Sequence, residues 1–248
     1  MKRFLIVLTA LILGYLAYDT ARYYLGWYID LQPDAPVSAF MSTDAQHLYM
    51  DRGAGPEEFT VKGVNLGVGI PGEWATDYAV SKETYLRWFS QMQEMGANTV
   101  RLAHYQHAQY FYDLCDKYGL VAWAEIPYIT EHMPEGRANT LSQMTELVVQ
   151  NYNHPSIVCW GLSNEITGSG KTEDLVENHK LLNDLCHKLD ATRPTTMAHI
   201  FMLDANDPLV FLPDIRSYNL YYGWYVGEWD QNDAWFDEFH KNHPDAVI

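Results

Sequence analysis

Two neighbouring polar residues, Asn164 and Glu165, come directly after the apolar run of residues 157–163. A carboxyl group can protonate a departing glycosidic oxygen, and a neighbouring amide can hydrogen-bond a sugar hydroxyl. The alternative is a helix start in which Asn164 is the N-cap and Glu165 lies in the first turn. Residues at the C-terminal ends of barrel strands point into the active site, so we favour a general acid/base role for Glu165.

The chain around this pair alternates between short apolar runs and amphipathic stretches from residue 59 onward. This alternation predicts repeated βα units and a parallel sheet. We expect strands at residues 59–65, 98–104, 120–126, 157–163, 195–200 and 215–220. We expect helices at residues 82–95, 108–118, 173–189 and 233–242, and one after Thr140. A closed barrel has eight strands, so the sequence predicts an α/β fold of the (β/α)8 TIM type that is incomplete, with about six βα units.

Local signals mark the ends of several of these helices. Ser81 is placed as an N-cap, and Thr140 and Gln143 have the spacing of a capping box. Gly96 and Gly119 lie where helices are expected to end. Beyond the last helix, residues 246–248 resemble the first residues of a seventh strand.

The first 28 residues differ from the rest of the chain. Lys2 and Arg3 precede an apolar run over residues 4–18, and a cluster of aromatic residues follows. This pattern predicts an N-terminal hydrophobic helix that is a signal anchor or a signal peptide, and the lack of an A-x-A site favours the anchor. The protein would be membrane-anchored or secreted, or cytoplasmic if residues 1–28 are no real anchor. We expect residues 29–58 to form a linker or cap before a partial barrel domain at residues 59–248.

The composition excludes several functional classes. A net charge of -16 disfavours nucleic acid binding, which demands a basic surface, and is compatible with a carbohydrate substrate. The 3 cysteines are widely spaced and form no CxxC pattern, which argues against a disulfide framework or a zinc site. His132, His154 and His199 show no metal-ligand spacing, so we predict no metal and no cofactor.

Several long motifs resemble glycoside hydrolase family 2, and their sequences are most similar to those of its β-galactosidases. The stretch NYNHPSIVCWGLSNE at residues 151–165 resembles the acid/base motif of that family. Further similar stretches occur in the same order at residues 98–105, 110–128, 190–194 and 217–225. The resemblance covers about residues 59–248, and several ordered motifs are more specific than one short pattern.

The resemblance implies roles for individual residues. Glu165 matches the general acid/base of the family and Asn164 its sugar-binding partner. Arg101 and His104 match residues that line the pocket near the nucleophile, and Tyr221 matches a tyrosine whose hydroxyl contacts the nucleophile. Three residues have an alternative role. Arg101 could form an ion pair beneath the barrel mouth, and His104 could be a core histidine whose hydrogen bonds are satisfied. Trp224 is either a sugar platform or a core residue, and Glu125 is expected to pair with Arg101 without a catalytic role.

The chain also departs from the family pattern. The resemblance places the nucleophile in a Ser-Glu-Tyr-Gly-like run that would follow Ile248, so we expect little turnover from these 248 residues alone. Where the family often has Asn-Arg-His at the end of the first strand, this chain has Asn65-Leu66-Gly67. The magnesium and sodium sites of the family are not traceable.

We therefore expect a retaining glycosidase that acts on terminal β-galactosides. The first alternative is another barrel glycosidase with an Asn-Glu pair: a β-glucuronidase, a β-mannosidase or a mannanase. The second alternative is a membrane-anchored, carbohydrate-binding barrel without catalysis, in which residues 4–18 would be the anchor. The sequence does not predict the oligomeric state.

Overall fold

The computed structural model describes residues 2–24, 40–44, 47–51, 53–67 and 80–248. The chain divides into two compact units, Met1–Val37 and Ser38–Ile248. In the first unit, helix α1 spans Lys2–Tyr24, and the side chains of residues 7–18 are exposed. The hydrophobic helix expected over residues 4–18 falls inside α1. None of the helices in the described ranges combines the length and the apolar character that crossing a bilayer requires.

The second unit contains two sheets. The smaller one is antiparallel and has the order β1 (Phe40–Thr43), β2 (Leu48–Asp51), β3 (Pro56–Glu58). The larger one is parallel and keeps sequence order: β4 (Gly63–Asn65), β5 (Thr99–Leu102), β6 (Val121–Glu125), β7 (Ile157–Asn164), β8 (Thr195–Ile200), β9 (Ile215–Asn219). Six parallel strands in sequence order are the incomplete TIM-type barrel that the sequence predicted.

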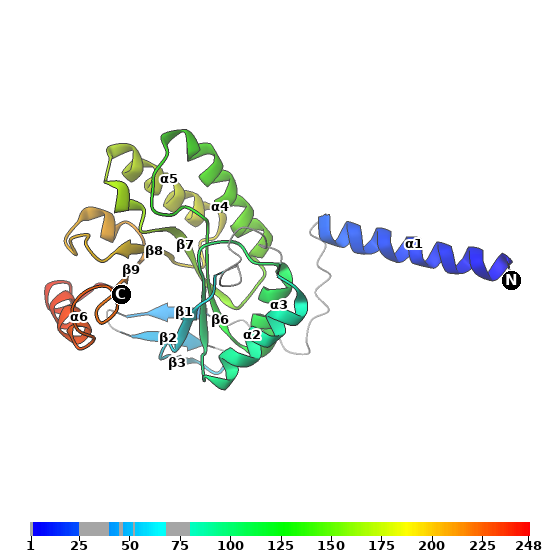
Figure 1. The fold of residues 1–248 in the computed structure, drawn as a ribbon, viewed down its shortest axis with the longest axis horizontal. Helices are drawn as coiled ribbons and strands as arrows, with labels where there is room; N and C mark the ends of the chain where they lie inside the picture. Colours follow the sequence, from blue (N-terminus) through cyan, green and yellow to red (C-terminus); the bar gives the residue numbers. More distant parts are fainter. Residues whose placement is uncertain (1, 25–39, 45–46, 52, 68–79) are drawn as a thin grey trace. The chain divides into compact units, whose positions relative to one another are not determined.

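Four helices connect strands from β4 to β8 and cover one side of the sheet: α2 (Lys82–Glu94), α3 (Gln109–Tyr118), α4 (Arg137–Asn151) and α5 (Glu173–Leu189). A further helix, α6 (Gln231–Asn242), follows β9. Figure 1 shows α2, α3, α4 and α5 along the outer side of the curved sheet. Alternate residues of β6 and of the middle of β7 point outward into the core that these helices share with the sheet: Ala122, Ala124, Trp160 and Leu162.

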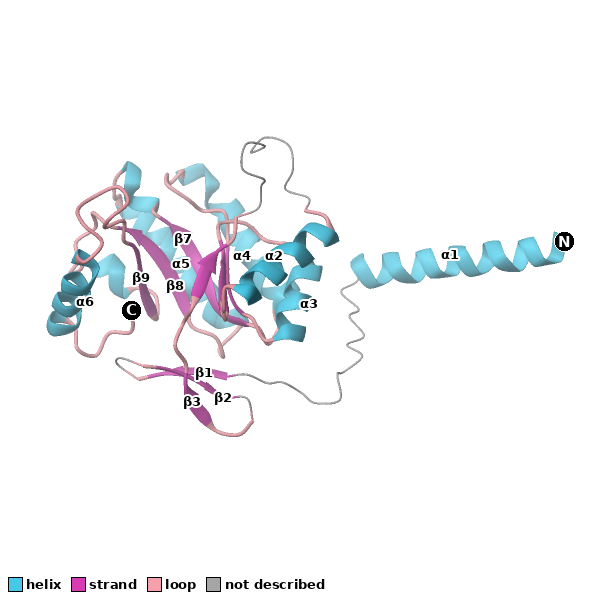
Figure 2. Cartoon of the chain, turned by 60° about the horizontal axis from the view of Figure 1, so that its bottom comes forward, coloured by secondary structure: helices cyan, strands magenta, loops and turns pink. Residues whose placement is uncertain are grey.

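The inner side of the sheet has a smaller apolar cluster at the N-terminal ends of its strands. Met50 of β2 is 4% exposed and packs in this cluster with Val121, Val158 and Cys159. Figure 2 shows β1, β2 and β3 below the larger sheet. Residues expected to form a linker or cap therefore include a small sheet that belongs to the same compact unit as the barrel strands.

The helix ends follow the sequence signals at three of four positions. Gly96 lies directly after Met95, the C-cap residue of α2, and has a left-handed backbone with φ 72°. The Ser81 side chain accepts a hydrogen bond from the Thr84 backbone N–H, and Gly119 ends α3 in the left-handed conformation with φ 75°. The capping box predicted at Thr140 is wrong, because α4 already begins at Arg137. A 3-10 turn over Pro134–Gly136 starts the helix earlier, and the Thr140 hydroxyl donates back to the Arg137 carbonyl.

Arg193 ties the N-terminal end of β7 to the segment before β8. Its guanidinium donates to the backbone carbonyls of Ile157 at 2.7 Å, Tyr152 at 2.9 Å and His154 at 3.0 Å. It also donates to the Asp190 carboxylate at 2.6 Å. These contacts give the motif at residues 190–194 a structural role at the end of the sheet away from Glu165.

The chain after α6 returns to the edge of β9. The Val247 carbonyl accepts a hydrogen bond of 2.9 Å from the Arg216 backbone N–H, and Ala246 is 5% exposed. A contact of this kind is what the first residues of a further strand beside β9 would make.

Candidate active site

Glu165 is delivered by the C-terminal end of β7, the strand whose eight residues are all buried. Its backbone is left-handed, with φ 47° and ψ 29°, a conformation that is unfavourable for residues with a side chain. Two backbone hydrogen bonds hold it there, from Glu165 N to Ala198 O at 2.8 Å and from Gly168 N to Glu165 O at 2.9 Å. A 3-10 turn follows, but Glu165 makes no side-chain cap to it.

The Glu165 carboxylate accepts two hydrogen bonds from the end of β9. Its Oε1 atom accepts from Asn219 Nδ2 at 2.8 Å and from the Tyr221 hydroxyl at 2.6 Å. Burial and the neighbouring carboxylate raise the pKa of Tyr221 to about 12, so this hydroxyl keeps its proton and donates it. Within the described residues Oε2 accepts no hydrogen bond, which leaves one carboxylate oxygen for proton transfer.

Asn164 faces the same side of the sheet and connects Glu165 to Arg101. Its Oδ1 atom accepts from Arg101 Nη2 at 2.8 Å and from Asn219 Nδ2 at 2.9 Å. Arg101 also donates to Asn219 Oδ1 at 3.1 Å. The helix-start alternative required the Asn164 side chain to cap the following turn. Instead, its oxygen is held by Arg101 and Asn219.

Glu125 is the second carboxylate of this network and is almost fully buried, at 1% exposed. Arg101 donates to both of its oxygens, from Nε at 2.8 Å and from Nη2 at 3.0 Å. His104 Nδ1 lies 2.6 Å from Glu125 Oε1. The pairing expected for Glu125 and Arg101 is thus present, and Arg101 and His104 meet at Glu125 rather than at Glu165.

Gly161 of β7 makes room for this arrangement. A Cβ atom at this position would lie 2.4 Å from the Glu125 Cβ and 2.5 Å from the Trp123 Nε1 atom. Neither contact is tolerable, so only glycine lets the side chains of β6 lie against the inner face of β7. The Arg101 guanidinium in turn lies 4.6 Å from the centre of the Trp123 ring.

Trp224 lies outside the hydrogen-bond network. It is 78% exposed in a tight turn after β9, where the Tyr221 carbonyl accepts from the backbone N–H groups of Trp224 and Tyr225. The Tyr225 ring lies 5.0 Å from the Tyr221 ring and 6.1 Å from the Trp224 ring, measured between centroids. The core-packing alternative for Trp224 is therefore wrong, because this side chain faces solvent.

Two features of the site go beyond what the sequence indicated. The Tyr221 hydroxyl donates to Glu165, while its expected contact with a nucleophile stays a prediction. Asn219 contacts Asn164, Arg101 and Glu165, yet its role was missed. The available signal was its position at the end of β9, because polar residues at the C-terminal strand ends of barrels face the site.

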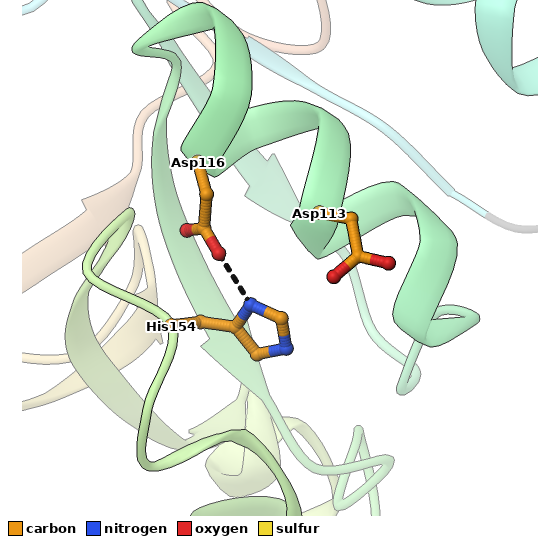
Figure 3. Close-up of side chains that lie close together, drawn as sticks. All are labelled: Asp113, Asp116 and His154. Atoms are coloured by element: carbon orange, nitrogen blue, oxygen red, sulfur yellow. Dashed lines mark hydrogen bonds and ion pairs between the residues drawn. The ribbon is translucent and has the colours of Figure 1, made fainter. Parts of the chain in front are cut away.

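The described residues also contain one group of side chains whose ligand atoms are close enough together to hold a metal ion. Figure 3 shows Asp113 and Asp116 of α3 beside His154, and their ligand atoms lie within 4.8 Å of one another. Both imidazole nitrogens are already engaged, Nδ1 with Asp116 at 2.6 Å and Nε2 with Gln109 Oε1 at 2.9 Å. We therefore interpret these contacts as a tie between α3 and the segment before β7.

We expect His154→Ala to lower the free energy of unfolding by about 2 kcal/mol, because it removes a buried imidazole and leaves its half-buried partners Asp116 and Gln109 without these hydrogen bonds. Urea unfolding measures this, and His47→Ala, at a side chain that is 47% exposed, is the control with an expected change below about 0.5 kcal/mol. EDTA is expected to leave the unfolding of both variants and of the parent unchanged. A loss of stability with EDTA that His154→Ala abolishes would instead identify a metal site.

Comparisons with known proteins agree with the barrel fold. A family model described as glycosyl hydrolases family 2, TIM barrel domain, matches residues 73–246. A β-glucuronidase from Bacteroides fragilis is 42% identical over 166 residues, which are 63% of this chain and 23% of that protein. A β-galactosidase from Lactococcus lactis is 34% identical over 143 residues, which are 54% of this chain and 13% of that protein.

Solved structures give the same result. An FMN-binding β-glucuronidase from Faecalibacterium prausnitzii L2-6 has a TM-score of 0.76 and 38% identity, and the match covers 84% of this chain and 32% of that one. Bacteroides uniformis β-glucuronidase 2 has a TM-score of 0.75 and 29% identity, with 84% and 26% covered. The matches thus cover between 13% and 32% of the length of these relatives. It belongs to glycosyl hydrolase family 2, and its matched residues lie in the TIM barrel domain of that family.

Proposed function

We propose that this chain supplies the acid/base side of a retaining glycosidase site that acts on terminal β-glucuronides. The observation that carries the proposal is the Glu165 carboxylate at the end of β7, held through one oxygen by Asn219 and Tyr221. The β-glucuronidases among the relatives support the sugar, since they include the matches with 42% and 38% identity. For this reason we propose the glucuronide ahead of the galactoside that the sequence motifs suggested.

Glu165 acts twice in this mechanism. It first donates its proton to the glycosidic oxygen while the bond from that oxygen to the anomeric carbon breaks. A second carboxylate, about 5–5.5 Å away, attacks the anomeric carbon and forms a glycosyl ester. Glu165, now ionised, then accepts a proton from the water that hydrolyses the ester. The related β-glucuronidase that is covalently bound to a cyclophellitol-6-carboxylate aziridine is compatible with such an ester.

The second carboxylate is not assigned to any described residue. Glu125 is the nearest candidate in the network, but both of its oxygens are held by Arg101 and one also by His104. A carboxylate with these partners is a poor nucleophile, because attack would remove the charge that pairs with the Arg101 guanidinium. Glu125 therefore holds Arg101, and Arg101 orients Asn164 toward the sugar.

A β-galactoside is the second candidate, for a specific reason. The guanidinium of Arg101 already contacts Glu125, Asn164 and Asn219, so the described network offers no uncommitted cation for a substrate carboxylate. A neutral sugar needs no such cation. The relative from Lactococcus lactis that is named a β-galactosidase supports the same alternative.

A panel of 4-nitrophenyl β-glycosides separates these candidates. We expect the protein encoded by the full reading frame around this chain to hydrolyse the glucuronide about tenfold or more faster, in kcat/KM, than the galactoside and the mannoside. We expect little turnover from the 248 residues alone, because the second carboxylate is not assigned within them. Preference for the galactoside would support the second candidate. If the full protein hydrolysed none of the three glycosides, both the glucuronidase and the galactosidase proposals would be wrong.

A further inference from the structure

A second residue with an unfavourable, left-handed backbone, Thr130, lies beside the end of β7 that carries Glu165. Apart from glycines, the described residues with positive φ are Glu165, at 47°, and Thr130, at 63°. The two lie side by side, because Thr130 N donates to Asn164 O at 3.0 Å and Asn164 N donates to Tyr128 O at 3.0 Å. Two unfavourable backbone conformations in contact need support from the surrounding structure. That support should lie behind the segment that follows β6 and behind the end of β7.

The support behind β7 is a buried histidine of α5. The Ser163 side chain points away from the site, and its hydroxyl lies 2.8 Å from His179 Nε2. His179 Nδ1 lies 2.8 Å from the Leu175 carbonyl, and Ser163 and His179 are 1% and 0% exposed. Burial lowers the pKa of His179 to about 4, so the ring is neutral at neutral pH. A carbonyl only accepts, so Nδ1 carries the proton and the Ser163 hydroxyl donates to Nε2.

The support behind the segment after β6 uses the same histidine. The Tyr128 ring stacks on the His179 ring with 5.1 Å between centroids and 21° between planes. Its hydroxyl contacts His132 Nδ1, and His132 Nε2 lies 2.6 Å from Asp174 Oδ2 at the start of α5. Arg137 of α4 holds the same carboxylate. Tyr128 is thereby fixed at both ends of its side chain while its backbone carbonyl holds Asn164.

We propose that Ser163, His179 and Tyr128 are positioning residues that set the direction of the Glu165 carboxylate for proton donation to the leaving group. Within the described part of the chain, the side chains that hydrogen-bond the Glu165 carboxylate are those of Asn219 and Tyr221, not these three. They act through the backbone of Asn164, which is bonded to Tyr128 on one side and follows Ser163 on the other. The inference rests on the proposed function, because it assumes that Glu165 is the proton donor.

A displaced proton donor has a signature that a merely destabilised protein lacks. A glycoside with a dinitrophenyl leaving group departs without protonation, whereas a phenyl or alkyl leaving group depends on it. Loss of donor alignment therefore slows the poor leaving groups selectively, and small displacements have large effects on rate. The ratio of kcat/KM for dinitrophenyl and phenyl β-glycosides of the same sugar measures it.

The experiment compares variants in the protein encoded by the full reading frame. Ser163→Ala and His179→Leu remove the two partners of one hydrogen bond, and each is expected to lower kcat/KM about tenfold for the phenyl substrate and less than about twofold for the dinitrophenyl substrate. The double variant should be no slower than the slower single variant. His179→Gln keeps an acceptor near the position of Nε2, so we expect it to restore most of the phenyl activity.

The matched control is Thr195→Val at the N-terminal end of β8, which is the end of the sheet away from Glu165. The Thr195 hydroxyl is fully buried and donates to Asn183 Oδ1 at 2.6 Å, so its loss also removes a buried hydrogen bond. We expect this variant to lower the melting temperature as Ser163→Ala does and to leave the ratio unchanged. Equal loss for both substrates, or no loss, in Ser163→Ala and His179→Leu would overturn the inference. Failure of the proposed function is seen separately, as full phenyl activity in Glu165→Gln.

Discussion

Glu165→Gln is expected to lower kcat/KM for phenyl β-glycosides about 10²–10⁴-fold, the usual worth of a general acid. The glutamine still accepts hydrogen bonds from Asn219 and Tyr221, so the site keeps its shape and loses only the proton. The first step with a dinitrophenyl substrate needs no acid and should remain fast. The glycosyl-enzyme then accumulates, because no base activates water, and a burst of dinitrophenol measures this.

Azide provides the control for this prediction. It attacks a glycosyl ester without giving up a proton, so it should restore turnover of the dinitrophenyl substrate in Glu165→Gln and have little effect on the parent. Glu177→Gln, at an exposed residue of α5, should match the parent in every assay. Retention of more than about a tenth of the phenyl activity in Glu165→Gln would remove Glu165 from the acid/base role.

A steep loss of stability between about pH 6.5 and pH 4.5 is the second large effect. Burial lowers the pKa of His107 and His179 to about 4 and that of His199 to about 3, from an ordinary value of 6.5. The unfolded chain therefore binds more protons than the folded one below pH 6.5. Their stabilising effect is complete above that value and is lost as the pH falls, by about 1.4 kcal/mol per pH unit for each histidine.

Urea unfolding at pH 7.0, 6.0, 5.0 and 4.5 measures this slope, and three histidines together give about 4 kcal/mol per pH unit. His179→Gln removes one of the three groups, so its slope should be about a third smaller. His47→Gln, at an exposed histidine, should leave the slope unchanged. A flat dependence in this range would show that these imidazoles are reached by solvent.

The order of the elements and the place of Glu165 could be predicted from the sequence for clear physical reasons. Buried parallel strands are nearly continuous apolar runs, so β7 and β8 stand out and their bounds differ from the expected ones by no more than one residue. The end of such a strand fixes which side chains reach the barrel mouth. This rule alone assigns Asn164 and Glu165 to the barrel mouth, without the family resemblance.

Other features depend on contacts that no local pattern encodes. Asn219 gains its role from Arg101, which is 118 residues away in sequence. The small sheet β1–β3 has short strands, and its apolar residue Met50 becomes part of a core only by packing with Val121 and Val158. The start of α4 was misplaced because a proline-led turn competes with the capping signal at Thr140.

The contact between Arg101 and Asn219 has a mechanical consequence for the half-barrel. These residues lie on β5 and β9, and β6, β7 and β8 come between the two strands in the sheet. Their hydrogen bond spans the concave side of the sheet and restrains the separation of β5 and β9. Asn164 accepts hydrogen bonds from both Arg101 and Asn219, and Glu165 accepts one from Asn219. The curvature of the sheet and the direction of the Glu165 carboxylate therefore change together.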